Sequence, residues 1–286
     1  MKLKTIRAVE PNQGVVKKFE KKLTALQTAH QRFILDEICA ALINSSLIVH
    51  DAKPSDESKI SKFLSAGAVG AFISRFVRNN LVRWGRLLIN KSKNLINWFV
   101  KNTAKSTANA QVQALASAGV SPIKVRQKFG IPTVSRQYLS PTAIKVLPKR
   151  IEEITNLVNK ISADEVAKLQ DVLVTGLESG QSLKQIRETL ASFKSFDARQ
   201  IANIARDQAA KVNSEVQRAN ALDLGITRAV WKHVPGRYTS RQTHLAMDKK
   251  VFDIEKGLYD EAVGRFVKPG ELKNCRCIMR LIFDDE

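Results

Sequence analysis

The sequence predicts an α+β protein that is mainly α-helical, with a small antiparallel β-sheet in its C-terminal domain. Apolar residues recur three to four positions apart through most of the chain up to residue 222, which is the period of an amphipathic helix. After Gly225, short segments rich in β-branched and aromatic residues alternate with glycine and proline, as in strands joined by turns. With 44% hydrophobic residues among 286, the chain can bury an ordinary core.

The first half of the chain predicts two long helical regions. Residues 14–50 carry apolar side chains at helical spacing and predict one helix or a helical pair. A polar stretch follows, in which Ser55 or Asp56 could cap the next helix. Residues 59–117 predict one long basic amphipathic helix, or two. We assign its tryptophans, Trp84 among them, to packing rather than to base stacking.

Residues 118–150 have a different character, because Pro122, Pro132, Pro141 and Pro148 recur every nine or ten residues. Each proline removes a backbone donor and biases the preceding residue toward extended geometry. We therefore expect an extended, basic arm here.

The remaining residues predict helices followed by a small sheet. Between about 149 and 222 we expect three helices, with Gly180 ending the first, Ser182 and Asp197 capping the next two, and Gly225 closing the last. The segments "ITRAVWKHV", "KKVFDI" and "CIMRLIF" predict the strands.

Charge divides the chain into three predicted segments. Residues 1–150 hold 26 Lys and Arg against 7 Asp and Glu, whereas the remainder holds 21 against 20. Residues 58–151 contain 17 basic residues and no carboxylate. We expect an N-terminal helical segment at 1–57, a basic helix with a proline-containing arm at 58–150 that faces DNA, and a C-terminal domain at 151–286.

Such an excess of positive charge repels itself unless a polyanion neutralises it, which indicates nucleic acid or an anionic membrane as the partner. The candidate DNA-binding side chains share the carboxylate-free stretch; they are Arg75, Arg78, Arg83, Arg86, Lys91, Lys93, Lys101, Lys105, Lys124, Arg126, Lys128 and Arg136.

Composition argues against two other classes. Only three cysteines are present, and Cys275 and Cys277 are too close in sequence for an unstrained cross-link, so a disulfide-stapled secreted fold has no support. The N-terminus lacks the apolar core of a signal peptide, and the longest nearly apolar run, "FLSAGAVGAFIS", is too short to span a bilayer. We expect a soluble protein in a reducing compartment.

The C-terminal segment holds the residues that could bind a metal. His233, His244, Cys275 and Cys277 formally make a four-ligand zinc set. Their spacing does not favour zinc, because structural sites usually present each ligand pair two to four residues apart. The opposing interpretation is that both cysteines face one side of a strand as small buried hydrophobes, with Arg276 pointing the other way.

Catalysis has weaker support. A redox dithiol normally has two residues between its thiols, and the sequence shows no third orienting residue for a cysteine–histidine nucleophile. The carboxylates at Asp248, Asp253, Glu255 and Asp260 fit an ordinary solvated stretch. We expect no catalytic residue and no bound cofactor, with zinc as the alternative.

Taken in order, several C-terminal motifs resemble the phage Mu F-like minor head proteins, also called head morphogenesis proteins. The resemblance covers about residues 180–283. Its residues are Ile204, Ala205, Arg206, Trp231, Arg241, Thr243, His244, Met247, Asp248, Pro269, Cys275, Arg276 and Cys277. The family's turn glycine after the aspartate is replaced by Lys249.

The resemblance implies a structural protein of a tailed phage or prophage, without catalysis, inside the head near the portal vertex and in the host cytoplasm during assembly. Its implied partners are the portal protein, the major capsid protein and packaged double-stranded DNA. We expect sequence-independent, salt-sensitive DNA binding, since the contacts would be to phosphates. Two hypotheses stay open: a membrane-active ejection protein whose helix at 63–100 lies on anionic lipid, and a zinc-dependent nuclease or toxin using His244 and the cysteines.

Overall fold

The structure is a computed structural model, and it describes residues 5–45, 66–132, 138–179, 194–235 and 240–282, together with residues 181, 185, 188 and 189. The chain divides into two compact units. We call residues 1–19, 95–154 and 202–286 the sheet unit, and residues 20–94 and 155–201 the helical unit.

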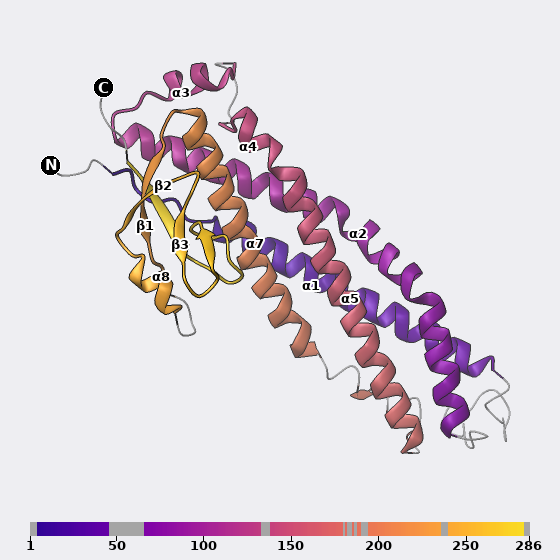
Figure 1. The fold of residues 1–286 in the computed structure, drawn as a ribbon. Helices are drawn as coiled ribbons and strands as arrows, with labels where there is room; N and C mark the ends of the chain where they lie inside the picture. Colours follow the sequence, from indigo (N-terminus) through magenta and orange to yellow (C-terminus); the bar gives the residue numbers. More distant parts are fainter. Residues whose placement is uncertain are drawn as a thin grey trace. The chain divides into compact units, whose positions relative to one another are not determined.

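Long helices make up most of the described chain, which confirms the predicted α+β class (Figure 1). They are α1 (Gln13–Ile43), α2 (Ala66–Ser117), α5 (Leu147–Glu178) and α7 (Lys194–Asp223). The predicted basic helix is a single continuous one from Ala66. Helix α7 begins three residues before the predicted cap at Asp197. It closes as predicted, because Gly225 has a φ of 82° and the N–H of Ile226 donates to Ala221 O.

The helical unit is built around apolar faces of α1, α2 and α5. Its buried core residues include Ile34, Ile38, Leu42, Ile73, Val77, Val166 and Leu173. Trp84 is fully buried among them, and its Nε1 donates to Glu37 Oε2 at 2.6 Å. Its predicted packing role is therefore confirmed. Each large side chain buried in this way adds about 1.5–3 kcal/mol to stability.

The sheet unit contains a three-stranded antiparallel sheet in the order β2 (Val251–Asp253), β1 (Arg228–Lys232) and β5 (Ile278–Leu281). Trp231 pairs with Met279 across β1 and β5. The N-terminal segment continues this sheet, since the N–H of Ile6 donates to Leu281 O at 2.9 Å. The segment around Ile6 thus lies alongside β5 at one edge of the sheet.

A two-stranded hairpin stands beside this sheet, formed by β3 (Leu258–Asp260) and β4 (Arg265–Val267). The sequence pattern does not predict it. The short helix α8 (Gln242–Ala246) is also unpredicted, and it lies between β1 and β2 in the chain.

Buried amides on α7 join the parts of the sheet unit. Asn213 and Gln217 both donate to Val9 O, at 3.0 and 2.9 Å. Asn220 donates to Gln111 Oε1 on α2 at 3.1 Å. Because these amides are buried, loss of any one of these hydrogen bonds would cost about 1–3 kcal/mol. Together the bonds fix the position of α7 along its neighbours.

The predicted extended arm at 118–150 is wrong, because its described residues form helices α3 (Pro122–Phe129) and α4 (Pro141–Lys145) and the start of α5. In both short helices a serine side chain, Ser121 or Ser140, accepts a bond at the N-cap and the following proline occupies the first turn. Proline is well tolerated there because that N–H has no intrahelical partner. These prolines therefore start helices instead of preventing them.

The three predicted segments stay a prediction. The boundary after residue 57 and the predicted caps at Ser55, Asp56, Gly180 and Ser182 lie outside the described residues. The boundary after residue 150 falls within α5.

Candidate metal centre

Four side chains predicted as the formal zinc set meet in the sheet unit. Cys275 Sγ lies 3.4 Å from His244 Nδ1, and Cys277 Sγ lies 3.6 Å from the same nitrogen. Cys277 Sγ also lies 3.6 Å from Nδ1 of His233. The donor atoms of His244, Cys275 and Cys277 lie within 4.8 Å of one another, and all three side chains are buried. His233 is not one of these three residues, and its contact with them is the one to Cys277.

Strand pairing explains part of this convergence. In the antiparallel register, Trp231 on β1 faces Met279 on β5. Two residues beyond this pair, His233 follows β1 and Cys277 precedes β5, so they arrive side by side. Helix α8 contributes His244 from the connection between β1 and β2.

The loop around Cys-Arg-Cys is held at several points. Arg241 Nη2 donates to Lys273 O at 2.9 Å, and the N–H of Asn274 donates to Asp207 on α7. Asn274 adopts a left-handed φ of 61°. The two cysteine side chains are buried, while Arg276 between them is exposed. This alternation agrees with the interpretation that the cysteines share one side, although the motif precedes β5 instead of lying within it.

Each histidine is held through its second ring nitrogen. His244 Nε2 lies 3.2 Å from Asp260 Oδ2, and Asp260 is fully buried. Asp260 Oδ1 accepts from the N–H of Ala262 at 3.0 Å. His233 Nε2 lies 3.0 Å from the hydroxyl of Ser240. Both rings are thereby oriented with Nδ1 toward sulfur.

Nearby N–H groups affect the pKa values of the two cysteines. The backbone N–H of Gly270 contributes to lowering the pKa of Cys275, and the backbone N–H of Val234 and the indole of Trp231 partly offset the rise in the pKa of Cys277. Trp231 Nε1 is buried and makes no hydrogen bond with a described residue. N–H donors of this kind stabilise a thiolate, which is the form of cysteine that binds metals.

The two thiols and His244 form an electrostatically coupled group. A hydrogen bond from the Cys277 thiol, with a smaller contribution from His244, outweighs burial and lowers the pKa of Cys275 to about 4. The hydrogen bond to Cys275, burial and the resulting negative charge raise the pKa of Cys277. The hydrogen bond to Cys275 also outweighs burial and raises the pKa of His244.

Other family-motif residues support this arrangement. Trp231 is fully buried and packs edge-on against His244, with ring centroids 5.4 Å apart. Asp248 Oδ1 accepts from the N–H of His233 at 2.7 Å. Lys249, which replaces the turn glycine expected from the resemblance, adopts a left-handed φ of 65° that favours glycine.

One residue of the site is not predicted. Asp260 was expected in a solvated stretch, and the structure instead places it in the interior against His244. Asp260 lies in strand β3, which the sequence does not predict. A stretch of sequence with several charged residues does not by itself show which of them is buried.

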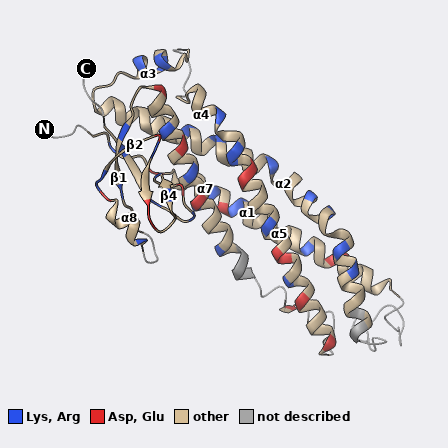
Figure 2. Cartoon of the chain, viewed as in Figure 1, with Lys and Arg blue, Asp and Glu red and all other residues tan. Residues whose placement is uncertain are grey.

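The predicted DNA-binding residues on α2 stand apart from this centre. Figure 2 shows lysines and arginines along α2, which contains no acidic residue. Arg75, Arg78 and Arg86 are exposed and make no ion pair or hydrogen bond with a described residue. Arg83 is different, because it pairs with Glu37.

The other candidates vary in their surroundings. Lys91 lies over the ring of Phe33, with Nζ 5.7 Å from its centroid, and Arg126 lies over Tyr138 at 4.7 Å. Lys105 is half-buried, whereas the remaining described ones are exposed; these are Lys93, Lys101, Lys124 and Lys128. Arg136 lies outside the described residues.

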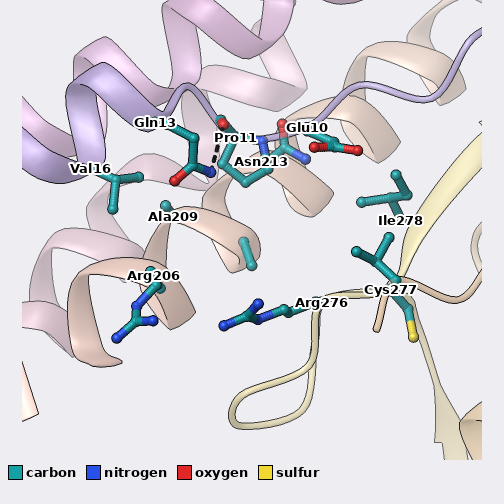
Figure 3. A pocket seen from close by; sticks show the side chains of 12 residues that line it. Glu10, Pro11, Gln13, Val16, Arg206, Ala209, Asn213, Arg276, Cys277 and Ile278 are labelled. Carbon is teal, nitrogen blue, oxygen red and sulfur yellow. Dashed lines mark hydrogen bonds between the residues drawn. The ribbon is translucent and has the colours of Figure 1, made fainter. Parts of the chain in front are cut away.

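A pocket of about 170 Å³ lies between the N-terminal segment, α7 and the Cys-Arg-Cys loop (Figure 3). Arg206 and Arg276 line it with Glu10, and the side chain of Arg276 extends from the loop toward α7. The Cys277 sulfur points away from the other labelled side chains of this pocket. Cys277 therefore belongs both to the lining of this pocket and to the metal centre.

Comparison with known proteins identifies the C-terminal region. Residues 167–280 match the family model described as Phage Mu protein F like protein, which confirms the predicted resemblance for this region. An uncharacterized protein of Haemophilus influenzae is 20% identical over 230 residues, which cover 80% of this chain and 46% of that protein. The uncharacterized protein YqbB of Bacillus subtilis is 24% identical over 153 residues, which cover 50% of this chain and 48% of YqbB. The chain thus spans about half the length of these curated relatives. No solved structure matches it.

Proposed function

From the Phage Mu F-like domain at residues 167–280, we propose that this chain is a structural minor head protein that acts in head morphogenesis of a tailed phage or prophage. In this proposal the Mu F-like domain docks on the portal protein or the major capsid protein, inside the head near the portal vertex. The basic N-terminal half contacts packaged double-stranded DNA. The family match is the observation that carries the proposal.

The charge on α2 supports the DNA contact. Arg75, Arg78 and Arg86 fall within about 80° of one another around the helix, at 3.6 residues per turn. All three are exposed, and the helix carries no carboxylate that could neutralise them. A row of cations of this kind suits phosphates, which are contacted without regard to base sequence.

A salt series tests this contact. We compare the full chain with an Arg75→Gln, Arg78→Gln, Arg86→Gln triple variant by fluorescence anisotropy on a duplex of arbitrary sequence. The slope of log affinity against log salt should fall by up to about 3 in the variant, since each phosphate contact contributes about 0.9.

The matched control removes the same charge elsewhere. Lys160, Lys250 and Arg280 are exposed residues outside the basic half. Their triple replacement by glutamine should leave most of the slope intact. Equal loss in both triple variants would show that net charge, and not the α2 row, determines binding, and a salt-insensitive affinity would refute the phosphate contact.

The head assignment is tested on particles. Gradient-purified, nuclease-treated particles of the encoding phage or prophage should contain a few copies of the chain by quantitative mass spectrometry. Absence from mature particles would refute an internal minor head protein.

A membrane-active role during DNA ejection is the second candidate. Leu81 and Val82 are exposed on α2 between Arg78 and Arg86, as on a helix that lies at a lipid interface. None of the described helices is long and apolar enough to cross a membrane. Leakage of anionic vesicles by the full chain would favour this function, and vesicles left intact would remove it.

A further inference from the structure

Three sulfur–nitrogen distances among Cys275, Cys277, His244 and His233 are close to those of a tetrahedral zinc site. Zinc–sulfur bonds of about 2.3 Å and zinc–nitrogen bonds of about 2.0–2.1 Å at the tetrahedral angle place sulfur and nitrogen about 3.5–3.6 Å apart. The three measured separations are 3.4, 3.6 and 3.6 Å.

Hydrogen bonding alone accounts poorly for this convergence. The Nδ1 atom of His244 faces both sulfurs, yet a ring nitrogen has either one hydrogen or one lone pair to offer. Cys277 Sγ likewise faces two ring nitrogens. A central cation would satisfy all of these contacts at once.

The surrounding groups prepare the donors for a metal. Asp260 Oδ2 lies 3.2 Å from Nε2 of His244, and Ser240 contacts Nε2 of His233, which leaves each Nδ1 lone pair free to face the ion. A carboxylate behind a ligating histidine is the usual outer partner in zinc sites.

We propose that this chain binds one Zn²⁺ ion through Cys275, Cys277, His244 and His233, as a structural centre of the Mu F-like domain. A donor set of two thiolates and two imidazoles is one that zinc prefers among the common cations. The ion would join three segments that are distant in sequence, namely the end of β1, helix α8 and the loop before β5. Binding energy at such a site becomes folding energy of the domain.

Metal content of the purified full chain is the first test. Protein prepared in reducing buffer without chelator, then reconstituted with Zn²⁺ and desalted, should contain about one zinc per chain by elemental analysis. A folded wild-type chain that retains no zinc after this treatment would overturn the proposal. Because this arm uses the wild type, misfolding of a variant does not affect it.

Variants then locate the ion. Cys277→Ser and His244→Ala should each weaken zinc affinity at least about tenfold. Cys39→Ser is the matched control, since Cys39 is buried in the helical unit, and it should keep full zinc content. Loss of zinc in the Cys39 variant, or retention in both site variants, would contradict the assignment.

Cobalt substitution tests the fourth ligand. Co²⁺ in a four-coordinate thiolate site gives intense visible bands together with sulfur-to-metal charge transfer. The wild-type chain should show both, and His233→Ala should change the visible bands while the charge transfer persists. An unchanged spectrum in His233→Ala would exclude His233 as a ligand. These readouts do not depend on head assembly or DNA binding, so they separate the zinc site from the proposed function.

Discussion

Replacing Asp260 with asparagine tests how the metal centre is oriented. Asp260 is fully buried, with Oδ2 3.2 Å from His244 Nε2 and Oδ1 accepting from Ala262 N–H at 3.0 Å. Asparagine has the same shape but offers one acceptor and one donor group. Either orientation of the amide places its NH₂ against another N–H, at Ala262 or at His244.

The two orientations have different consequences. With the NH₂ toward His244, the ring must accept at Nε2, so Nδ1 carries the proton and cannot bind zinc. With the NH₂ toward Ala262, a buried backbone donor loses its partner, at a cost of about 1–3 kcal/mol. Loss of an outer partner typically weakens metal affinity 10–100-fold, which is about 1.4–2.7 kcal/mol.

Competition with a chromophoric chelator measures the zinc affinity of the wild type and of Asp260→Asn. Asp253→Asn is the control, because Asp253 is exposed and its Oδ1 accepts from Glu255 N–H at 2.8 Å, a role that asparagine can fill. We expect the wild-type affinity for the control. A folded Asp260→Asn protein that binds zinc as tightly as the wild type would refute the proposed orientation of His244.

Two further predictions concern stability. Gly257 has a φ of 86° and an added Cβ would lie 2.3 Å from Val267 O, whereas Gly264 has a φ of 70° with nothing within 4 Å. Gly264→Ala should therefore cost about 1–2 kcal/mol and Gly257→Ala at least about 2 kcal/mol more in urea unfolding, and equal losses would contradict the clash. Burial, reinforced by Lys91, lowers the pKa of His30 from its ordinary 6.5, so below that pH the unfolded chain binds the proton first and the folded state loses stability. Relative to His30→Leu, the wild type should lose up to about 1.4 kcal/mol per pH unit as the pH falls from 6.5, and a constant difference would contradict this.

Sequence pattern predicts the elements whose packing follows a simple period. The stripe containing Trp84 predicts a long helix, and its burial follows from the same stripe. The region around Pro122 and Pro141 is harder to predict, because a proline that breaks a helix in its interior is well tolerated in the first turn. The serine before each of them is the signal that a helix begins there.

The site was only partly predictable. The sequence indicates His233, His244 and the two cysteines as possible metal donors. Their spacing along the sequence does not favour a metal site, because sequence spacing does not show which residues strand pairing brings together. The antiparallel register of β1 and β5 brings His233 to Cys277 across 44 residues of sequence. The role of Asp260 depends on its contact with His244, 16 residues earlier in the chain, and no local sequence pattern encodes that contact.

The geometry of this site favours a structural zinc over a catalytic one. It therefore argues against the nuclease or toxin hypothesis. A catalytic zinc keeps one position for water and substrate, whereas a structural one is closed by protein ligands. His244, Cys275 and Cys277 are 2–3% exposed, and the Cys277 sulfur points away from the neighbouring pocket. His233 fills the fourth position in our proposal. Zinc should accordingly raise the melting temperature of the full chain without producing nuclease activity, and zinc-dependent DNA cleavage that His244→Ala abolishes would reverse this conclusion.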